Sequence, residues 1–116
     1  MTIPDPSEQL RRLCLALPQA TEQAMKRGPT YRIADKIFAM DRSVDGGVTV
    51  WCKVPAGSQA LMIEAAPQLF FVPPYVGPKG WIGMRLEPRS DWTEVTRLVR
   101  QSYRLIAPRK LAALLS

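Results

Sequence analysis

The stretch Val48-Thr49-Val50-Trp51-Cys52-Lys53-Val54 (48–54) decides the fold, because apolar and polar side chains alternate along it. Alternation with a period of two is typical of a half-buried β-strand. The three valines and Cys52 share one face, which we expect to meet the core. Trp51 and Lys53 share the other face and are expected to point away from it. The stretch therefore predicts a sheet whose two faces differ in chemistry.

The same period extends to both sides of this strand. Residues 30–34 and 37–42 are predicted strands around a turn at Asp35-Lys36, and Asp45-Gly46-Gly47 is a tight-turn signal before residue 48. Residues 81–86 resume the alternation, with one face formed by Ile82, Met84 and Leu86 and the other by Trp81, Gly83 and Arg85. Residues 70–80 are dense in proline and glycine, which predicts an ordered loop rather than a strand.

Helical patterns flank the strands. Asp5 is a predicted N-cap for a helix that ends at Pro18, and its apolar stripe is Leu10, Leu13, Cys14 and Leu17. A short helix is expected before Pro67, a long one starts at Ser90 or Asp91, and a terminal one opens at Pro108. This order predicts a single α+β domain over residues 1–116, in which helices pack on one face of an antiparallel sheet in two layers.

The composition argues against catalysis. The chain has 116 residues, no histidine and two cysteines. Without histidine it lacks the usual general base, the usual partner of a nucleophilic serine or cysteine, and the commonest metal ligand. The carboxylates show no catalytic pairing, so we expect no enzyme activity, no metal site and no cofactor. Cys14 and Cys52 sit among apolar neighbours and are expected to be buried and reduced; a disulfide or a reactive thiol is the alternative.

The formal net charge of +6 favours anionic partners, of which nucleic acid is the most common. The alternative is a basic protein with no specific anionic partner, since net charge also governs solubility. The apolar stretches are too short to cross a membrane, and the start MTIPDPSEQL lacks the basic and apolar regions of a signal peptide. A cytoplasmic location without membrane association is therefore the expectation.

The outward face of the sheet is the strongest candidate site, because rings beside cations are what single-stranded nucleic-acid binders use. Arg32 joins this face if Tyr31 and Ile33 point inward, and the loop 70–80 adds two residues at its rim. The candidate nucleic-acid-binding residues are Trp51, Lys53, Tyr75, Lys79, Trp81 and Arg85. The alternative is that the tryptophans are buried as ordinary core and that the loop only routes the chain.

A second basic surface is offered by the C-terminal part of the chain. Helical spacing brings three arginines of the last long helix together, and two more cations follow Pro108; these five residues are Arg97, Arg100, Arg104, Arg109 and Lys110. Such a stripe could contact phosphates, or it could simply be a solvated helix face.

Four segments, in this order, resemble the MmcQ/YjbR family. They are Lys36-Ile37-Phe38-Ala39, Pro73-Pro74-Tyr75-Val76-Gly77, Gly80-Trp81-Ile82, and Ser102-Tyr103 before Ala107-Pro108. The resemblance runs from about residue 13 to residue 115. It implies a CyaY-like, two-layer α+β fold around a curved antiparallel sheet, and DNA binding through a double-wing motif. Many members have a His-Pro pair where this chain has Gly28-Pro29, so any role of that imidazole is in doubt here.

Two functions remain open at this point. The leading hypothesis is a DNA-binding or other nucleic-acid-binding protein of low sequence specificity, with Lys53, Lys79 and Arg85 on phosphates. The alternative is a protein-interaction module that holds a protein partner with the same face or loop. A third possibility is a small-ligand pocket under the loop, lined by Tyr75 and Trp81.

Overall fold

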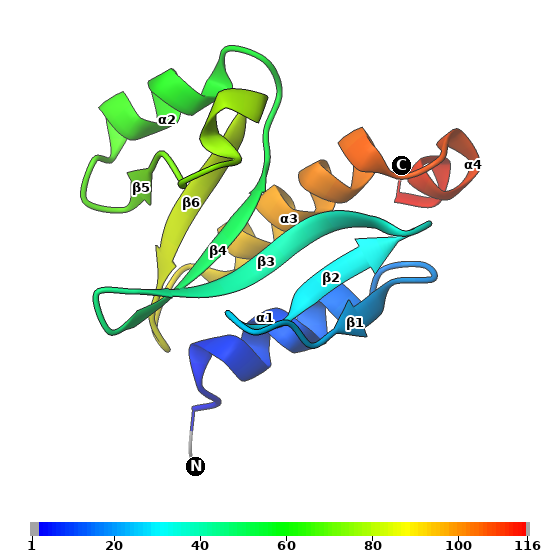
Figure 1. Cartoon of the computed structure of the whole chain (residues 1–116), viewed down its shortest axis with the longest axis horizontal. Coiled ribbons are helices and arrows are strands. Elements are labelled where there is room, and N and C mark those ends of the chain that lie inside the picture. Colours follow the sequence, from blue (N-terminus) through cyan, green and yellow to red (C-terminus); the bar gives the residue numbers. More distant parts are fainter. Residues whose placement is uncertain (1–2, 116) are drawn as a thin grey trace.

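The computed structural model describes residues 3–115 and contains helices, short 3-10 helices and one sheet. The helices are α1 (Pro6–Leu15), α2 (Ser58–Ala65), α3 (Trp92–Ile106) and α4 (Arg109–Ala112), and the 3-10 helices are η1 (Gly77–Lys79) and η2 (Ala113–Leu115). The strands are β1 (Thr21–Gln23), β2 (Thr30–Ile33), β3 (Lys36–Val44), β4 (Gly47–Lys53), β5 (Phe70–Phe71) and β6 (Trp81–Leu86). All neighbouring strands are antiparallel, in the order β1-β2-β3-β4-β6-β5 (Figure 1).

One face of this sheet packs against α1 and α3, and we call it the covered face. It carries the side chains predicted to point inward, and they form one core with the apolar stripes of the two helices. The members of this core include Leu10, Cys14, Ile33, Phe38, Val50, Cys52, Ile82, Met84, Val95, Val99 and Tyr103. The two-layer α+β architecture is therefore confirmed, as is the alternation of β4 and β6.

The opposite side is the open face, which neither α1 nor α3 crosses; in Figure 1 both helices lie behind the sheet. Met40, Trp51 and Trp81 form a separate cluster there, with Phe71 and Val76 packed against it. Met40 lies opposite Trp51 across β3 and β4, and Lys53 lies opposite Trp81 across β4 and β6. The sheet thus has two hydrophobic layers, one on each side.

Helix ends and hairpin turns follow the local chemistry of the sequence. Asp5 Oδ1 accepts a hydrogen bond from the Glu8 amide at 2.9 Å, and Asp91 caps α3 in the same way. Asp45 and Gly46 both have positive φ, as a two-residue turn between twisted strands requires. The other turn uses Ala34 and Asp35 rather than the expected Asp35-Lys36, because Lys36 is already paired with Ile33.

Three boundaries differ from the sequence expectation. Strand β1 was not expected, because its three residues are polar and all exposed and so show no alternation. The prediction of a loop throughout 70–80 is wrong at Phe70–Phe71, which pairs with Met84 and Gly83 as strand β5. Helix α1 ends at Leu15, before Pro18, although Leu17 remains buried.

A serine of α3 joins the helix layer to the sheet. The pairing of β3 with β4 ends at Ala39 and Cys52, so Phe38 and Lys53 would form the next pair. The fully buried hydroxyl of Ser102 lies between them: it donates to the Phe38 carbonyl at 2.7 Å and accepts from the Lys53 amide at 2.9 Å. Ser102 therefore continues the ladder through its side chain at the point where the two strands separate.

In the part of the chain that the structure describes, none of the helices is long and apolar enough to span a membrane.

Candidate nucleic-acid interface

The two tryptophans of the candidate site are on the open face but are buried in it. Trp51 and Trp81 are each 8% exposed, and both belong to one cluster with Met40. The prediction that they point away from the main core is confirmed. Their rings are nevertheless covered, as the alternative interpretation of the sequence had it, so they form the floor of this surface rather than free stacking platforms.

Trp51 is held in place by the strand beside it. Its Nε1 donates to Thr49 Oγ1 at 3.1 Å, and that hydroxyl donates to the Arg42 carbonyl at 2.7 Å. The guanidinium of Arg42 lies over the indole ring, 6.0 Å from its centroid. A cation at this position is attracted by the electron-rich ring face. Arg42 therefore covers the tryptophan and places a positive charge above it.

A second arginine covers a second ring further along the face. Phe71 of β5 lies against Gly83, where an added Cβ would come within 2.3 Å of the ring, so only glycine leaves room for it. The guanidinium of Arg85 lies over Phe71, 4.8 Å from its centroid, while the Arg85 side chain remains exposed. The open face therefore repeats one arrangement, an aromatic ring on the sheet with an arginine outside it.

The charges of the strands are sorted between the two faces. The alternation and register of β2, β3, β4 and β6 put four cations on the open face, namely Arg32, Arg42, Lys53 and Arg85. The strands of residues 3–115 contain two acidic residues, Glu22 and Asp41, and both lie on the covered face. Glu22 accepts from Arg11 of α1 at 2.8 Å, and Asp41 is 7% exposed beside Ser7. No carboxylate from these strands therefore offsets the cations of the open face.

Burial favours the protonated form of the Asp41 carboxyl. Desolvation raises the pKa of its carboxyl above the ordinary value, and a contact with Ser7 and the charge of Arg42 act in the opposite direction. It lines a polar hollow of about 380 Å³ with Tyr31 and Arg27, at the edge of the covered face. The carboxylate is thus separated from the open face by the sheet itself.

Gly28 lies beside this hollow, at the position where the resemblance raised the question of a missing histidine. Its φ of 130° is a value that residues with a side chain rarely adopt, and an added Cβ would lie 2.4 Å from the Asp41 carbonyl oxygen. Arg42 Nη1 donates to the Gly28 carbonyl at 3.2 Å. A side chain at position 28 would therefore require the backbone of β3 to shift.

The loop after β5 and the short helix η1 cross in front of β6 in Figure 1, at one end of the open face, and this segment contains Tyr75 and Lys79. Val76 packs in the Trp51–Trp81 cluster, and its carbonyl accepts from the Lys79 amide at 3.0 Å. Tyr75 is 78% exposed, and Lys79 is exposed as well. The four sheet residues of the prediction therefore lie on the open face, and the segment with Tyr75 and Lys79 is bonded to its Trp81 end through Val76.

Sequence reasoning missed Arg42, which covers Trp51. A β-bulge interrupts the pairing of β2 with β3 between Tyr31 and Arg32, and it disturbs the simple count of faces along residues 37–42. The detectable signal was the spacing of Met40 and Arg42, which are two residues apart and share a face. Arg32, the conditional member, does lie on the open face because Tyr31 and Ile33 point into the core.

The second basic surface is partly occupied by its own contacts. Arg97 forms an ion pair with Glu94 at 3.1 Å, and Arg104 Nη2 donates to the Leu115 carbonyl at 2.5 Å. Arg109 and Lys110 are exposed on α4, a helix of one turn at the edge of the molecule. This part of the chain therefore offers fewer free cations than its sequence indicates.

Both cysteines are free and buried in the core, as predicted. Burial raises the pKa of the Cys14 thiol well above its ordinary value, and it raises the pKa of Cys52 to about 12. A thiol must lose its proton to act as a nucleophile, so neither residue suits a reactive role. The alternative of a reactive cysteine is therefore disfavoured.

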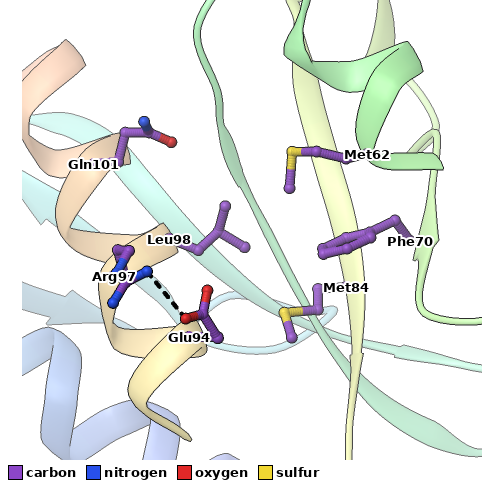
Figure 2. Close-up of a pocket in the computed structure, with 7 residues that line it drawn as sticks. All are labelled: Met62, Phe70, Met84, Glu94, Arg97, Leu98 and Gln101. Carbon is purple, nitrogen blue, oxygen red and sulfur yellow. Dashed lines mark ion pairs between the residues drawn. The ribbon is translucent and has the colours of Figure 1, made fainter. Parts of the chain in front are cut away.

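Two apolar hollows among residues 3–115 lie away from the proline-rich loop. Figure 2 shows one between α2 and α3, where Met62 and Phe70 face Leu98 and Met84, with the Glu94–Arg97 ion pair at its mouth. Its volume is about 200 Å³, and a larger neighbour of about 660 Å³ shares Phe70 and Met84 with it. Neither Tyr75 nor Trp81 lines these two hollows, which gives no support to a small-ligand site in the loop.

Comparison with known proteins gives a family and a fold. The family model described as YjbR matches residues 15–105. The crystal structure of the Deinococcus radiodurans protein DR2400, described with the family-model domain DUF419, is similar to this chain with a TM-score of 0.78. The two are 18% identical, and the similarity covers 98% of this chain and 90% of that one, which shows a shared fold. No curated protein matches the chain.

Proposed function

The chain belongs to the YjbR family, as its sequence motifs predicted, and we propose that it is a nucleic-acid-binding protein of low sequence specificity that uses the open face of its sheet. The observation that carries this proposal is the separation of charge. Arg32, Arg42, Lys53 and Arg85 lie on the open face, whereas the acidic residues of the strands lie on the covered one. A surface of one sign attracts a polyanion along its whole length.

The geometry of the face supports contact with phosphates rather than reading of bases. Two of the arginines lie over aromatic rings, Arg42 over Trp51 and Arg85 over Phe71, which holds their charged ends in fixed places. Phosphate contacts position a protein on nucleic acid but carry little sequence information. DNA or RNA bound in this way is expected to show low sequence preference.

We also propose binding rather than catalysis, and a cytoplasmic location. Both thiols are buried, and their raised pKa values keep them protonated, so the nucleophiles best suited to covalent chemistry are inactive. Two free cysteines in one core are compatible with a reducing compartment. A cytoplasmic protein of this charge would have access to nucleic acid.

The test is a binding titration with labelled DNA, read by fluorescence anisotropy at about 50 mM and about 200 mM salt. The double variant Lys53→Glu with Arg85→Glu should lose about tenfold or more in affinity at the lower salt, because two phosphate contacts become repulsive. It should also show a shallower salt dependence, since each phosphate contact contributes about 0.9 to the slope of log K against log salt.

The matched control is Arg109→Glu with Lys110→Glu, which changes the net charge equally but at α4. It should retain most of the affinity if the open face is the binding surface. Equal losses in the two double variants would show that only overall charge matters, and a loss confined to the α4 variant would move the site there. An absence of binding at the lower salt would refute the proposal and favour a protein partner.

A further inference from the structure

Tyr75 combines an exposed ring with an unusual backbone conformation. Its side chain is 78% exposed and its φ is 66°, in the left-handed region that residues with a Cβ rarely adopt. The Val76 amide donates to the Pro74 carbonyl at 2.7 Å, so the chain turns tightly around this one residue. The turn presents the ring outward instead of packing it into the Trp51–Trp81 cluster.

The loop on both sides of Tyr75 is fixed to the rest of the fold. Pro73 is fully buried, and Gly77 lies so close to Val72 that an added Cβ would be 2.5 Å from its Cγ1. The side-chain amide of Gln59 in α2 donates to the carbonyls of Gly77 at 3.0 Å and Trp81 at 2.6 Å. A ring on such a support has little freedom to lose when a ligand binds.

The backbone beside Tyr75 is bonded to the end of the open face that carries Lys53. Val76, the following residue, packs against Trp81, and the Trp81 amide donates to the Val76 carbonyl at 3.4 Å. Lys53 lies opposite Trp81 in the sheet, and Lys79 is bonded through its amide to the same Val76 carbonyl. The segment that carries Tyr75 is therefore linked through Val76 to the end of the open face that holds Lys53 and Lys79.

Among the aromatic side chains of residues 3–115, Tyr75 alone is exposed. On the open face, Trp51 and Trp81 are covered and Phe71 lies beneath Arg85. Stacking on a tyrosine requires a base whose face is free. In a duplex those faces are already stacked on neighbouring base pairs, so the ring can act only where the nucleic acid is single-stranded.

Resting on the function proposed above, we infer that Tyr75 stacks on one unpaired base and that the open face therefore prefers single-stranded to double-stranded nucleic acid. Lys53 and Lys79 hold the phosphates beside that base. The arginines further along the face continue the contact with the backbone, without a need for unpaired bases. The preference thus resides in one residue, whereas the overall affinity is shared by several.

The experiment compares one labelled DNA strand with its duplex, using anisotropy titrations of the full chain and of three variants. The unchanged protein should bind the single strand more tightly. Tyr75→Ala should weaken single-strand binding by about tenfold and leave duplex binding nearly unchanged, because one stacking contact is lost. Tyr75→Phe should retain the preference, since the ring remains.

A third variant, Tyr75→Gly, separates binding from folding. Glycine adopts the positive φ without a steric penalty, so this variant should unfold at the same temperature as the unchanged protein or higher, yet lose the preference as Tyr75→Ala does. An unchanged ratio of the two affinities in Tyr75→Ala, or a duplex bound at least as tightly by the unchanged protein, would overturn this inference alone. Failure to bind either DNA would overturn the proposed function as well.

Discussion

The two faces of the sheet solve the problem of burial in different ways. On the covered face, aliphatic and aromatic side chains from the strands interdigitate with α1 and α3, and Phe38, Val50, Ile82 and Tyr103 are fully buried. On the open face, Met40, Trp51 and Trp81 reach nearly the same burial although α1 does not contact them and α3 contributes its last residue, Ile106. The rest of their cover comes from strand residues such as Phe71, from the loop residue Val76 and from the arginine over Trp51.

This difference separates stability from function. A surface covered by helices cannot bind a large partner, whereas a surface covered by long cationic side chains is hydrophobic underneath and charged outside. Substitutions on the covered face should therefore act mainly on the free energy of unfolding. Substitution of the exposed cation Arg85 should leave folding almost unchanged, whereas Arg42 also covers Trp51.

The largest effect is expected for Phe38→Ala on the covered face. Phe38 is fully buried and meets the Tyr103 ring edge-on, with centroids 5.4 Å apart. Removing it should lower the free energy of unfolding by about 3–5 kcal/mol, because a cavity remains. Met40→Ala on the open face should cost about 2 kcal/mol, since relaxed side chains can fill part of the space. Urea unfolding measures both; equal losses would contradict the difference between the faces.

Ser102→Ala should come next, with a loss of about 2 kcal/mol. It leaves the Phe38 carbonyl and the Lys53 amide without their partner at a buried position. Thr96→Ala is the matched control on the same helix, because the Thr96 hydroxyl bonds only to the Trp92 carbonyl one turn away. Thermal and urea unfolding should show a clear loss for Ser102 and almost none for Thr96. Similar losses of unfolding free energy in the two variants would show that the Ser102 hydrogen bonds do not stabilise the packing of α3 on the sheet.

Asp41→Asn should stabilise the protein at about pH 7, by less than the Ser102 change costs. Burial raises the pKa of Asp41 in the folded state above its value in the unfolded chain, so its contribution to stability is present below the unfolded pKa and lost as the pH rises through the folded pKa. Asparagine is uncharged at every pH in this range, so it has no such dependence. The advantage of the variant in urea unfolding should therefore shrink toward about pH 4; a constant difference would argue against a buried charge.

The smallest effect is expected for Arg85→Ala, about 0.5 kcal/mol, because Arg85 is exposed and the change removes its contact over the Phe71 ring and a long hydrogen bond from Nη1 to the Gln68 carbonyl at 3.4 Å. Arg89→Ala is the control, since Arg89 is also an exposed arginine and lies in the turn between β6 and α3. Differential scanning calorimetry should place both variants close to the unchanged protein. A loss above about 2 kcal/mol for Arg85 would show that this part of the open face stabilises the fold.

The sequence was most informative where a pattern repeats. The alternation in 48–54 and 81–86 correctly assigned Val50, Cys52, Ile82 and Met84 to the core and Trp51 and Trp81 to the other side. It could not foresee β1, whose residues are all exposed, or β5, which exists because Gly83 makes room for Phe71. Such contacts depend on residues distant in the sequence and leave no local period.

The sequence predicted which face carries the candidate site, but not which aromatic rings are exposed on it. The period of two placed Lys53 and Arg85 on one face, and the composition of 70–80 indicated an ordered loop there. Whether a tryptophan is exposed depends on what lies above it, and here that is Arg42, Val76 and a neighbouring ring. No spacing rule records this cover, and for this reason we propose the stacking role for Tyr75 and not for the tryptophans.

The hydroxyl of Ser102 has a consequence for hydrogen exchange. The Lys53 amide is bonded to a side chain of α3 and not to β3, so its exchange with solvent deuterium should report the docking of the helix rather than the pairing of the strands. Because Lys53 also belongs to the basic open face, the backbone at this point connects the two layers of the molecule. If α3 separates from the sheet, the exchange rate of the Lys53 amide on the open face should therefore increase.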